Sequence, residues 1–169
     1  VAAIDSLIDG QPDAALRFDS ATGTLRELRF LPTGAKTSIA RAIPIEQEQG
    51  ARAFLRKHAA LLGLRDADNE LHLTSRRTDD AGHPHLRFTQ HHLGVPVWGR
   101  EVRLHYDNRG ELTLVQGAYV HSPDVIDTRP QIAAADAAAR AWADAAAIPP
   151  RELDATLVFY GGDAATPRL

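Results

Sequence analysis

The chain has 169 residues, of which 44% are hydrophobic and 24% are charged, a balance that is typical of a folded protein and argues against disorder. The formal net charge is −3 and both signs are interspersed, which argues against a nucleic-acid partner. No apolar run reaches the roughly 20 residues of a membrane-spanning helix, so no membrane partner is expected. The absence of cysteine excludes disulfides, cysteine-based zinc sites and thiol catalysis. The chain starts at Val1 and contains no methionine, so we expect a cleavage product whose signal peptide has been removed.

The first forty residues predict a β-hairpin. Leu16 and Phe18 alternate with polar neighbours, a turn containing glycine follows at 19–23, and the alternation returns at Leu28 and Phe30.

Residues 44–63 predict an amphipathic helix. Its apolar stripe recurs at helical spacing and contains Ala51, Phe54, Leu55, Leu61 and Leu62. Gly63 followed by Leu64 is typical of a left-handed glycine that ends a helix, with its hydrophobic contact. His58 lies near this end, where a cationic side chain is favoured.

Residues 70–120 predict an antiparallel meander of strands, with turns at 79–82 and 108–110. A helix covering one face of such a sheet gives an α+β fold. The alternation in the strand after the first turn assigns side chains to two faces. One face carries Leu86, Phe88, Gln90 and His92, and the other carries His85, Arg87, Thr89 and His91.

The segment Gly94–Gly99 holds a proline inside a strand run, between two glycines. Proline cannot donate to a sheet, so this segment is expected at an edge or a bend, with bulges at the glycines. Two interpretations stay open. Trp98 lies in the core of a bent strand, or the segment presents backbone groups and Trp98 to a partner.

Residues 122–130 predict a linker, because prolines flank a polar stretch there. Residues 131–148 predict a second helix, alanine-rich, with Ile132 and Trp142 on its apolar stripe, and 153–160 predict a strand. One helix and one strand cannot bury their own apolar faces. The unit 131–169 is therefore expected to be truncated or completed by another chain.

Histidine is the residue type that suggests chemistry. His83, His85, His91 and His92 make a metal site conceivable, while solvated histidines on the outer face of a strand pair are the simpler interpretation. No His-Glu-x-x-His helix, Gly-x-Ser-x-Gly elbow or phosphate loop is present. We expect no catalytic residue in this chain.

The strand residues from Leu86 to Gly99, with Gly94-Val95-Pro96-Val97-Trp98-Gly99 as their specific part, resemble the fungalysin/thermolysin propeptide (FTP) domain. The helix that ends at Leu61–Leu64 precedes them at the spacing which that family shows, so the resemblance covers about residues 45–120. The family usually carries an aromatic residue where His92 stands, and we expect His92 to pack in its place. Residues 132–160 resemble the start of a PepSY domain.

The resemblance implies an α+β fold of two small helix-on-antiparallel-sheet (cystatin-like) units. These are an FTP-like domain at 44–121 and a truncated PepSY-like domain at 131–169, preceded by the hairpin segment 1–43. It also implies the propeptide of a secreted zinc metalloprotease, exported as part of a precursor. Such a propeptide is an intramolecular folding chaperone and inhibitor of its partner, the catalytic domain. We expect Arg87, Gln90 and Trp98 at that interface.

No cofactor is expected in this chain, because zinc and calcium would belong to the protease domain. Two alternatives remain: a free-standing secreted protease inhibitor or binding module of PepSY type, and a metal-binding module built on His83, His85, His91 and His92.

Overall fold

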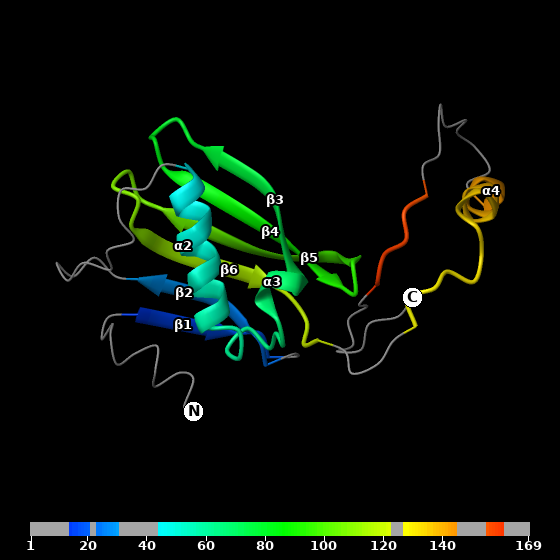
Figure 1. Ribbon diagram of the computed structural model, residues 1–169, viewed down its shortest axis with the longest axis horizontal. Coiled ribbons are helices and arrows are strands. Elements are labelled where there is room, and N and C mark those ends of the chain that lie inside the picture. Colours follow the sequence, from blue (N-terminus) through cyan, green and yellow to red (C-terminus); the bar gives the residue numbers. More distant parts are fainter. Residues whose placement is uncertain (1–13, 21–22, 31–43, 123–126, 145–154, 161–169) are drawn as a thin grey trace.

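The fold of the chain is a mixed α+β arrangement built on one six-stranded antiparallel sheet (Figure 1). The computed structural model describes residues 14–20, 23–30, 44–122, 127–144 and 155–160. The strand order is β1-β2-β6-β5-β4-β3. The strands are β1 (Ala14–Phe18), β2 (Leu25–Phe30), β3 (Leu71–Thr78), β4 (Pro84–His92), β5 (Val95–Tyr106) and β6 (Leu112–Ala118).

The predicted N-terminal hairpin is confirmed, and it belongs to the main sheet. β1 pairs with β2 across a turn in which Gly23 has φ +68°, a left-handed conformation that glycine adopts without strain. β2 then pairs with β6, with Leu28 opposite Val115. The hairpin segment and the predicted FTP-like unit therefore share one sheet and one core.

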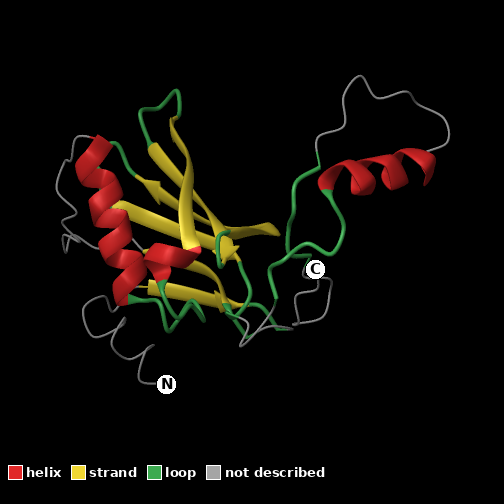
Figure 2. Ribbon diagram, turned by 45° about the vertical axis from the view of Figure 1, so that its right-hand side comes forward, coloured by secondary structure: helices red, strands yellow, loops and turns green. Residues whose placement is uncertain are grey.

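Helix α2 (Pro44–Lys57) covers one face of the sheet and leaves the other open (Figures 1 and 2). Alternation places one side of each strand against this helix, and Leu28, Leu55, Phe88 and Leu104 are at most 1% exposed. Burial of such side chains is the main favourable contribution to folding. The second side of the sheet is polar, and we call it the open face.

Helix α2 ends at Lys57, before the predicted end at Gly63, because residues 58–63 form turns instead of a further helical segment. The left-handed glycine itself is confirmed after these turns. Gly63 has φ +67°, the amide of Leu64 donates to the carbonyl of Ala59 across 2.9 Å, and Leu64 is buried. His58, in contrast, is not held as a cation. Burial, followed by the charge of Lys57, lowers the pKa of His58, because desolvation disfavours the charged imidazolium.

A short helix that the sequence pattern does not indicate, α3 (Ala67–Glu70), precedes β3. Asp66 caps it by accepting hydrogen bonds from the amides of Asp68 and Asn69. Glu70 is buried and its carboxylate accepts from the amides of Arg65 and Asp66 and from the hydroxyl of Ser122. These bonds tie the start of β3 to the chain that leaves β6.

The bend in β5 lies where the sequence predicted it. Thr89 pairs with Glu101 and His91 with Pro96, so residues 97–100 of β5 lie opposite Gln90 alone. Gly99 has φ +67° within this bulge, where an L side chain would be strained. The bulge shifts the alternation of β5, and Val97 becomes buried while Trp98 points outward.

The described part of the second predicted unit contains helix α4 (Ala134–Asp144), which lies apart from the sheet in both views and has no buried residue (Figures 1 and 2). Trp142 is exposed on this helix, and Ile132 is exposed before it, since the helix begins at Ala134 and not at the predicted residue 131. The predicted helix residues 145–148 fall outside the described ranges. Of the predicted strand 153–160, the described part contributes one parallel bridge, from Phe159 to Val97 of β5.

Candidate functional site

Arg87 lies on the open face, as the alternation of β4 predicts. It is exposed, and its Nε atom lies 3.4 Å from a carboxylate oxygen of Glu101 on β5. Arg103 pairs with the same carboxylate. Two guanidinium groups therefore share one carboxylate, and such exposed pairs leave the arginines accessible to a partner at little energetic cost.

Trp98 is 64% exposed at the edge of β5. The interpretation that placed it in the core is therefore wrong. The backbone edge beside it is already paired within the chain. The amide of Trp98 donates to the carbonyl of Phe159 across 2.7 Å, and the amide of Phe159 donates to the carbonyl of Pro96 across 2.9 Å. What this edge offers to a partner is an aromatic side chain rather than free backbone groups.

Phe159 fills the pocket behind that edge. It is fully buried against Val97 and Val120, and the ring of His92 meets it edge-on with 5.4 Å between centroids. His92 thus packs as expected for a residue that replaces an aromatic one. Its buried Nε2 atom has no hydrogen-bond partner among the described residues.

Gln90 is not on the surface, because it is 1% exposed. Its amide nitrogen donates to the carbonyl of Val120 across 2.8 Å, and its amide oxygen accepts from the amide of Val120 across 3.0 Å. These bonds fix the chain where it leaves β6. Any contribution of Gln90 to an interface would act through the position of this segment.

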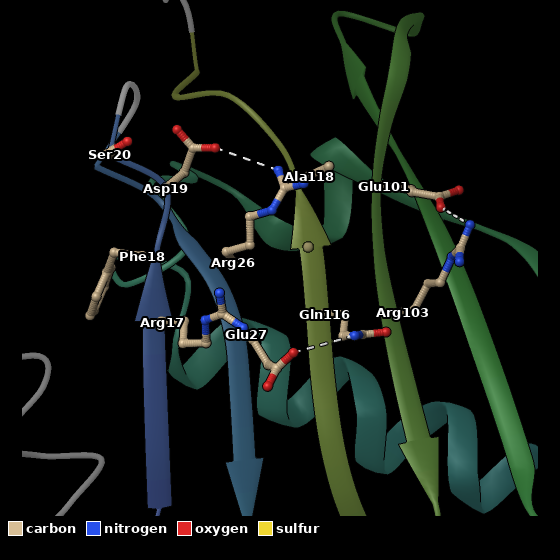
Figure 3. Close-up of a pocket in the computed structure, with 11 residues that line it drawn as sticks. Arg17, Phe18, Asp19, Ser20, Arg26, Glu27, Glu101, Arg103, Gln116 and Ala118 are labelled. Atoms are coloured by element: carbon tan, nitrogen blue, oxygen red, sulfur yellow. Dashed lines mark hydrogen bonds and ion pairs between the residues drawn. The ribbon is translucent and has the colours of Figure 1, made fainter.

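A hollow of about 490 Å³ lies on the open face beside β1, β2, β5 and β6 (Figure 3). Its charged side chains balance, with three cations and three anions: Arg17, Arg26, Arg103, Asp19, Glu27 and Glu101. Arg26 lies 3.5 Å from Asp19, and Gln116 donates to Glu27 across 3.5 Å. This hollow depends on the pairing of β2 with β6, which no local pattern in the sequence specifies.

The four histidines considered for a metal do not converge. His83 and His85 both approach Asp79 Oδ2 at 3.3 Å, while His91 stacks on His72 with 3.9 Å between ring centroids. His92 faces Phe159 instead. Within the described ranges, no group of three or more His, Asp or Glu side chains is arranged to hold a metal ion.

The histidines predict how stability depends on pH. Burial is the main cause that lowers the pKa of His58, of His91 and of His105, with a further contribution from a neighbouring positive group in each case. The unfolded chain, with histidine pKa near 6.5, therefore binds protons in mild acid that the folded chain does not, and the free energy of unfolding falls.

We expect a lower urea midpoint at pH 5.5 than at pH 7.5, and a smaller difference in His58→Gln. Carboxyl groups whose pKa is lowered stay ionised between pH 5.5 and pH 7.5, so they do not contribute to this difference. The pKa of Asp79, for example, is lowered to about 2, chiefly by the hydrogen bond from the amide of His83. Equal midpoints at the two pH values would contradict the prediction.

Comparison with known protein families gives a match that covers part of this site. Residues 69–119 match the family described as Fungalysin/Thermolysin Propeptide Motif. The matched stretch begins in α3 and includes β3, β4, β5 and β6, so it contains Arg87, Gln90 and Trp98. The match confirms an FTP domain at these residues and suggests a non-catalytic pro-segment of a metalloprotease precursor. Its partner would be the catalytic domain.

No solved structure matches the chain. FTP propeptides belong to secreted proteases, which is consistent with secretion. Among the described residues, no helix has the length and apolar character needed to span a membrane.

Proposed function

We propose that the chain is the pro-segment of a secreted zinc metalloprotease and acts as an intramolecular folding chaperone and inhibitor of the catalytic domain. The observation that carries this proposal is the FTP match over β3–β6. The open face and the β5 edge of the same strands offer accessible side chains, with Arg87 on the face and Trp98 at the edge.

The physical basis is preferential binding to the folded catalytic domain. A pro-segment that binds the native surface and not the unfolded chain stabilises the native state in proportion to its affinity. The same contact excludes substrate if it covers the cleft. Trp98 suits this role, because exposed tryptophans often carry much of the binding energy of an interface, and Arg87 offers a planar donor for a carboxylate.

The proposal also includes the second unit, residues 131–169. We assign residues 131–169 to a PepSY-like domain and the two units to the cystatin-like class of helix on antiparallel sheet. Trp142 on α4 and Ile132 just before this helix are both exposed, which supports this assignment, since apolar side chains of this kind are normally covered by a partner element. Zinc and calcium would be bound by the protease domain and not by this chain.

Inhibition in trans tests the function. The purified chain is titrated into the catalytic domain encoded downstream in the same frame, and peptide hydrolysis is followed. We expect saturable inhibition. Trp98→Ala should weaken it about 30-fold, which corresponds to a loss of about 2 kcal/mol, and Arg87→Ala should weaken it less.

Arg129→Ala is the matched control, because its side chain is 88% exposed and lies on the connector outside the FTP match. Absence of inhibition, together with no gain in refolding yield of the catalytic domain, would overturn the proposal. If no protease domain follows in frame but a separate protease is inhibited, the alternative of a free-standing secreted inhibitor holds instead.

A further inference from the structure

A second hollow on the open face, of about 300 Å³, is rich in cationic side chains. It lies beside β3, β4 and β5, and Arg103 borders both this hollow and the one described above. The side chains that matter for its chemistry are Arg77, Arg87, Arg103, Asp79, His85 and His105. We call it the arginine hollow.

The arginine hollow carries a net positive charge even when its histidines are neutral. Three guanidinium groups face two carboxylates, because Arg87 and Arg103 share Glu101 and Asp79 lies in the wall. One positive charge remains. β6, which flanks β5 on the other side, brings no charged side chain between Leu112 and Ala118. A single small anion therefore matches this hollow better than a polyanion.

Two histidines at the edge of the hollow form a direct hydrogen bond. His85 and His105 lie opposite each other on β4 and β5, with 2.8 Å between their Nδ1 atoms. Nε2 of His85 lies 3.3 Å from Asp79 Oδ2. A carboxylate only accepts, so this nitrogen donates. In the neutral pair, Nδ1 of His85 then accepts the hydrogen bond from Nδ1 of His105.

This arrangement disfavours the uptake of one more proton by the free pair. A proton on Nδ1 of His85 breaks the bond between the rings, because two N–H groups then face each other. A proton on Nε2 of His105 creates a charge at a buried atom that makes no hydrogen bond within the described residues, and the side chain of Gln116 only partly offsets the effect of burial. His83 also approaches Asp79, and the flanking guanidinium groups, Arg103 among them, add positive potential around the pair.

We propose that the arginine hollow binds one carboxylate side chain of a protein partner, and that this carboxylate enters together with one proton taken up by the His85–His105 pair. The protonated pair has one N–H donor without an acceptor inside the pair. The carboxylate accepts a hydrogen bond from this N–H and offsets the added positive charge. The partner that supplies it is the catalytic domain if the proposed function holds; the site itself does not depend on that function.

The sign of the pH dependence follows. Binding takes up a proton, so affinity rises as the pH falls from 7.5 to 5.5, and it falls again below about pH 4.3, where a glutamate probe becomes neutral. The pKa of His105 is lowered by burial and then by the charges of His85 and Arg103, against an opposing contribution from Gln116, and it should rise when the anion is bound.

The test uses the purified chain and a small probe, acetyl-Glu-amide, with acetyl-Gln-amide as its uncharged isostere. Imidazole Cε1–H resonances are followed by ¹H–¹³C NMR at constant ionic strength. We expect saturable shifts of His85 and His105 with acetyl-Glu-amide alone, with a Kd on the order of millimolar. Binding should be about tenfold tighter at pH 5.5 than at pH 7.5.

Three variants sharpen the test. Arg103→Gln should weaken binding at both pH values. Arg26→Gln should not, although it removes an arginine of the other hollow whose side chain is 59% exposed, against 47% for Arg103. His105→Gln should bind with little pH dependence. If that variant does not fold, as its amide spectrum would show, His85→Gln replaces it.

Equal affinity at the two pH values, or equal shifts with acetyl-Gln-amide, would overturn the proposal. Shifts that need added Zn²⁺ and vanish with EDTA would overturn it in favour of a metal site. Because no protease is present, these outcomes are independent of the inhibition assay. A chain that inhibits but does not bind the probe refutes the carboxylate site alone.

Discussion

Replacing Gln90 by alanine is expected to lower the free energy of unfolding by about 3 kcal/mol. The side chain is 1% exposed and makes two hydrogen bonds to the backbone of Val120, which is itself 2% exposed. Truncation leaves a buried amide and a buried carbonyl without partners and opens a cavity, and each of these effects is destabilising. Urea denaturation followed by circular dichroism measures the change.

Two variants separate the contributions. Gln90→Met keeps most of the volume and removes the hydrogen bonds, so most of the loss should remain if the bonds dominate. Gln116→Ala removes a partly buried glutamine from the open face, where the change should stay within about 0.5 kcal/mol. A loss below about 1 kcal/mol for Gln90→Ala would show that Val120 finds other partners. Inhibition of the catalytic domain by Gln90→Ala is therefore measured only under conditions in which this variant is folded.

Adding one methyl group at Gly117 is expected to destabilise the chain by about 3 kcal/mol. A Cβ atom on Gly117 would lie 2.1 Å from Cε1 and 2.6 Å from Cδ1 of Tyr119. Tyr119 is 1% exposed within the main core. The ring therefore has no room to retreat without moving its neighbours, since interiors are close-packed. The same denaturation measurement applies.

Gly23→Ala is the control for this prediction. Gly23 has φ +68°, and a Cβ there would meet nothing within 4 Å, so only the strain of the left-handed backbone, about 1 kcal/mol, should appear. Combining Gly117→Ala with Tyr119→Val should recover part of the loss, because the clash is removed. Strictly additive effects of the two changes would contradict the steric explanation.

The local periodicity of apolar residues was sufficient to predict most of the helices and strands. The stripe of α2 and the alternation in β1, β2 and β3–β6 are each set by which face is buried, so the elements and their turns could be predicted. The alternation even placed Gln90 on the same face as Leu86 and Phe88. A polar side chain at such a position indicates a buried hydrogen bond rather than an interface contact.

The features that depend on long-range pairing could not be predicted. The pairing of Leu28 with Val115 joins strands far apart in the chain, and nothing local specifies it. The outward direction of Trp98 depends on the bulge opposite Gln90, which changes the parity of β5. The contact of His85 with His105 requires the register of two strands, so the arginine hollow emerges only in three dimensions.

The contact of Phe159 with β5 closes a large loop in the chain. One buried ring and two backbone hydrogen bonds hold the segment around Phe159 on the sheet. This small contact persists because the connection through α4 keeps the segment nearby, at an effective concentration on the order of millimolar. A single proteolytic cut between Val120 and Phe159 turns it into a bimolecular contact, which dissociates at concentrations on the order of micromolar. Cleavage of the connector would thereby uncover the β5 edge and its pocket, although it touches no residue of the sheet.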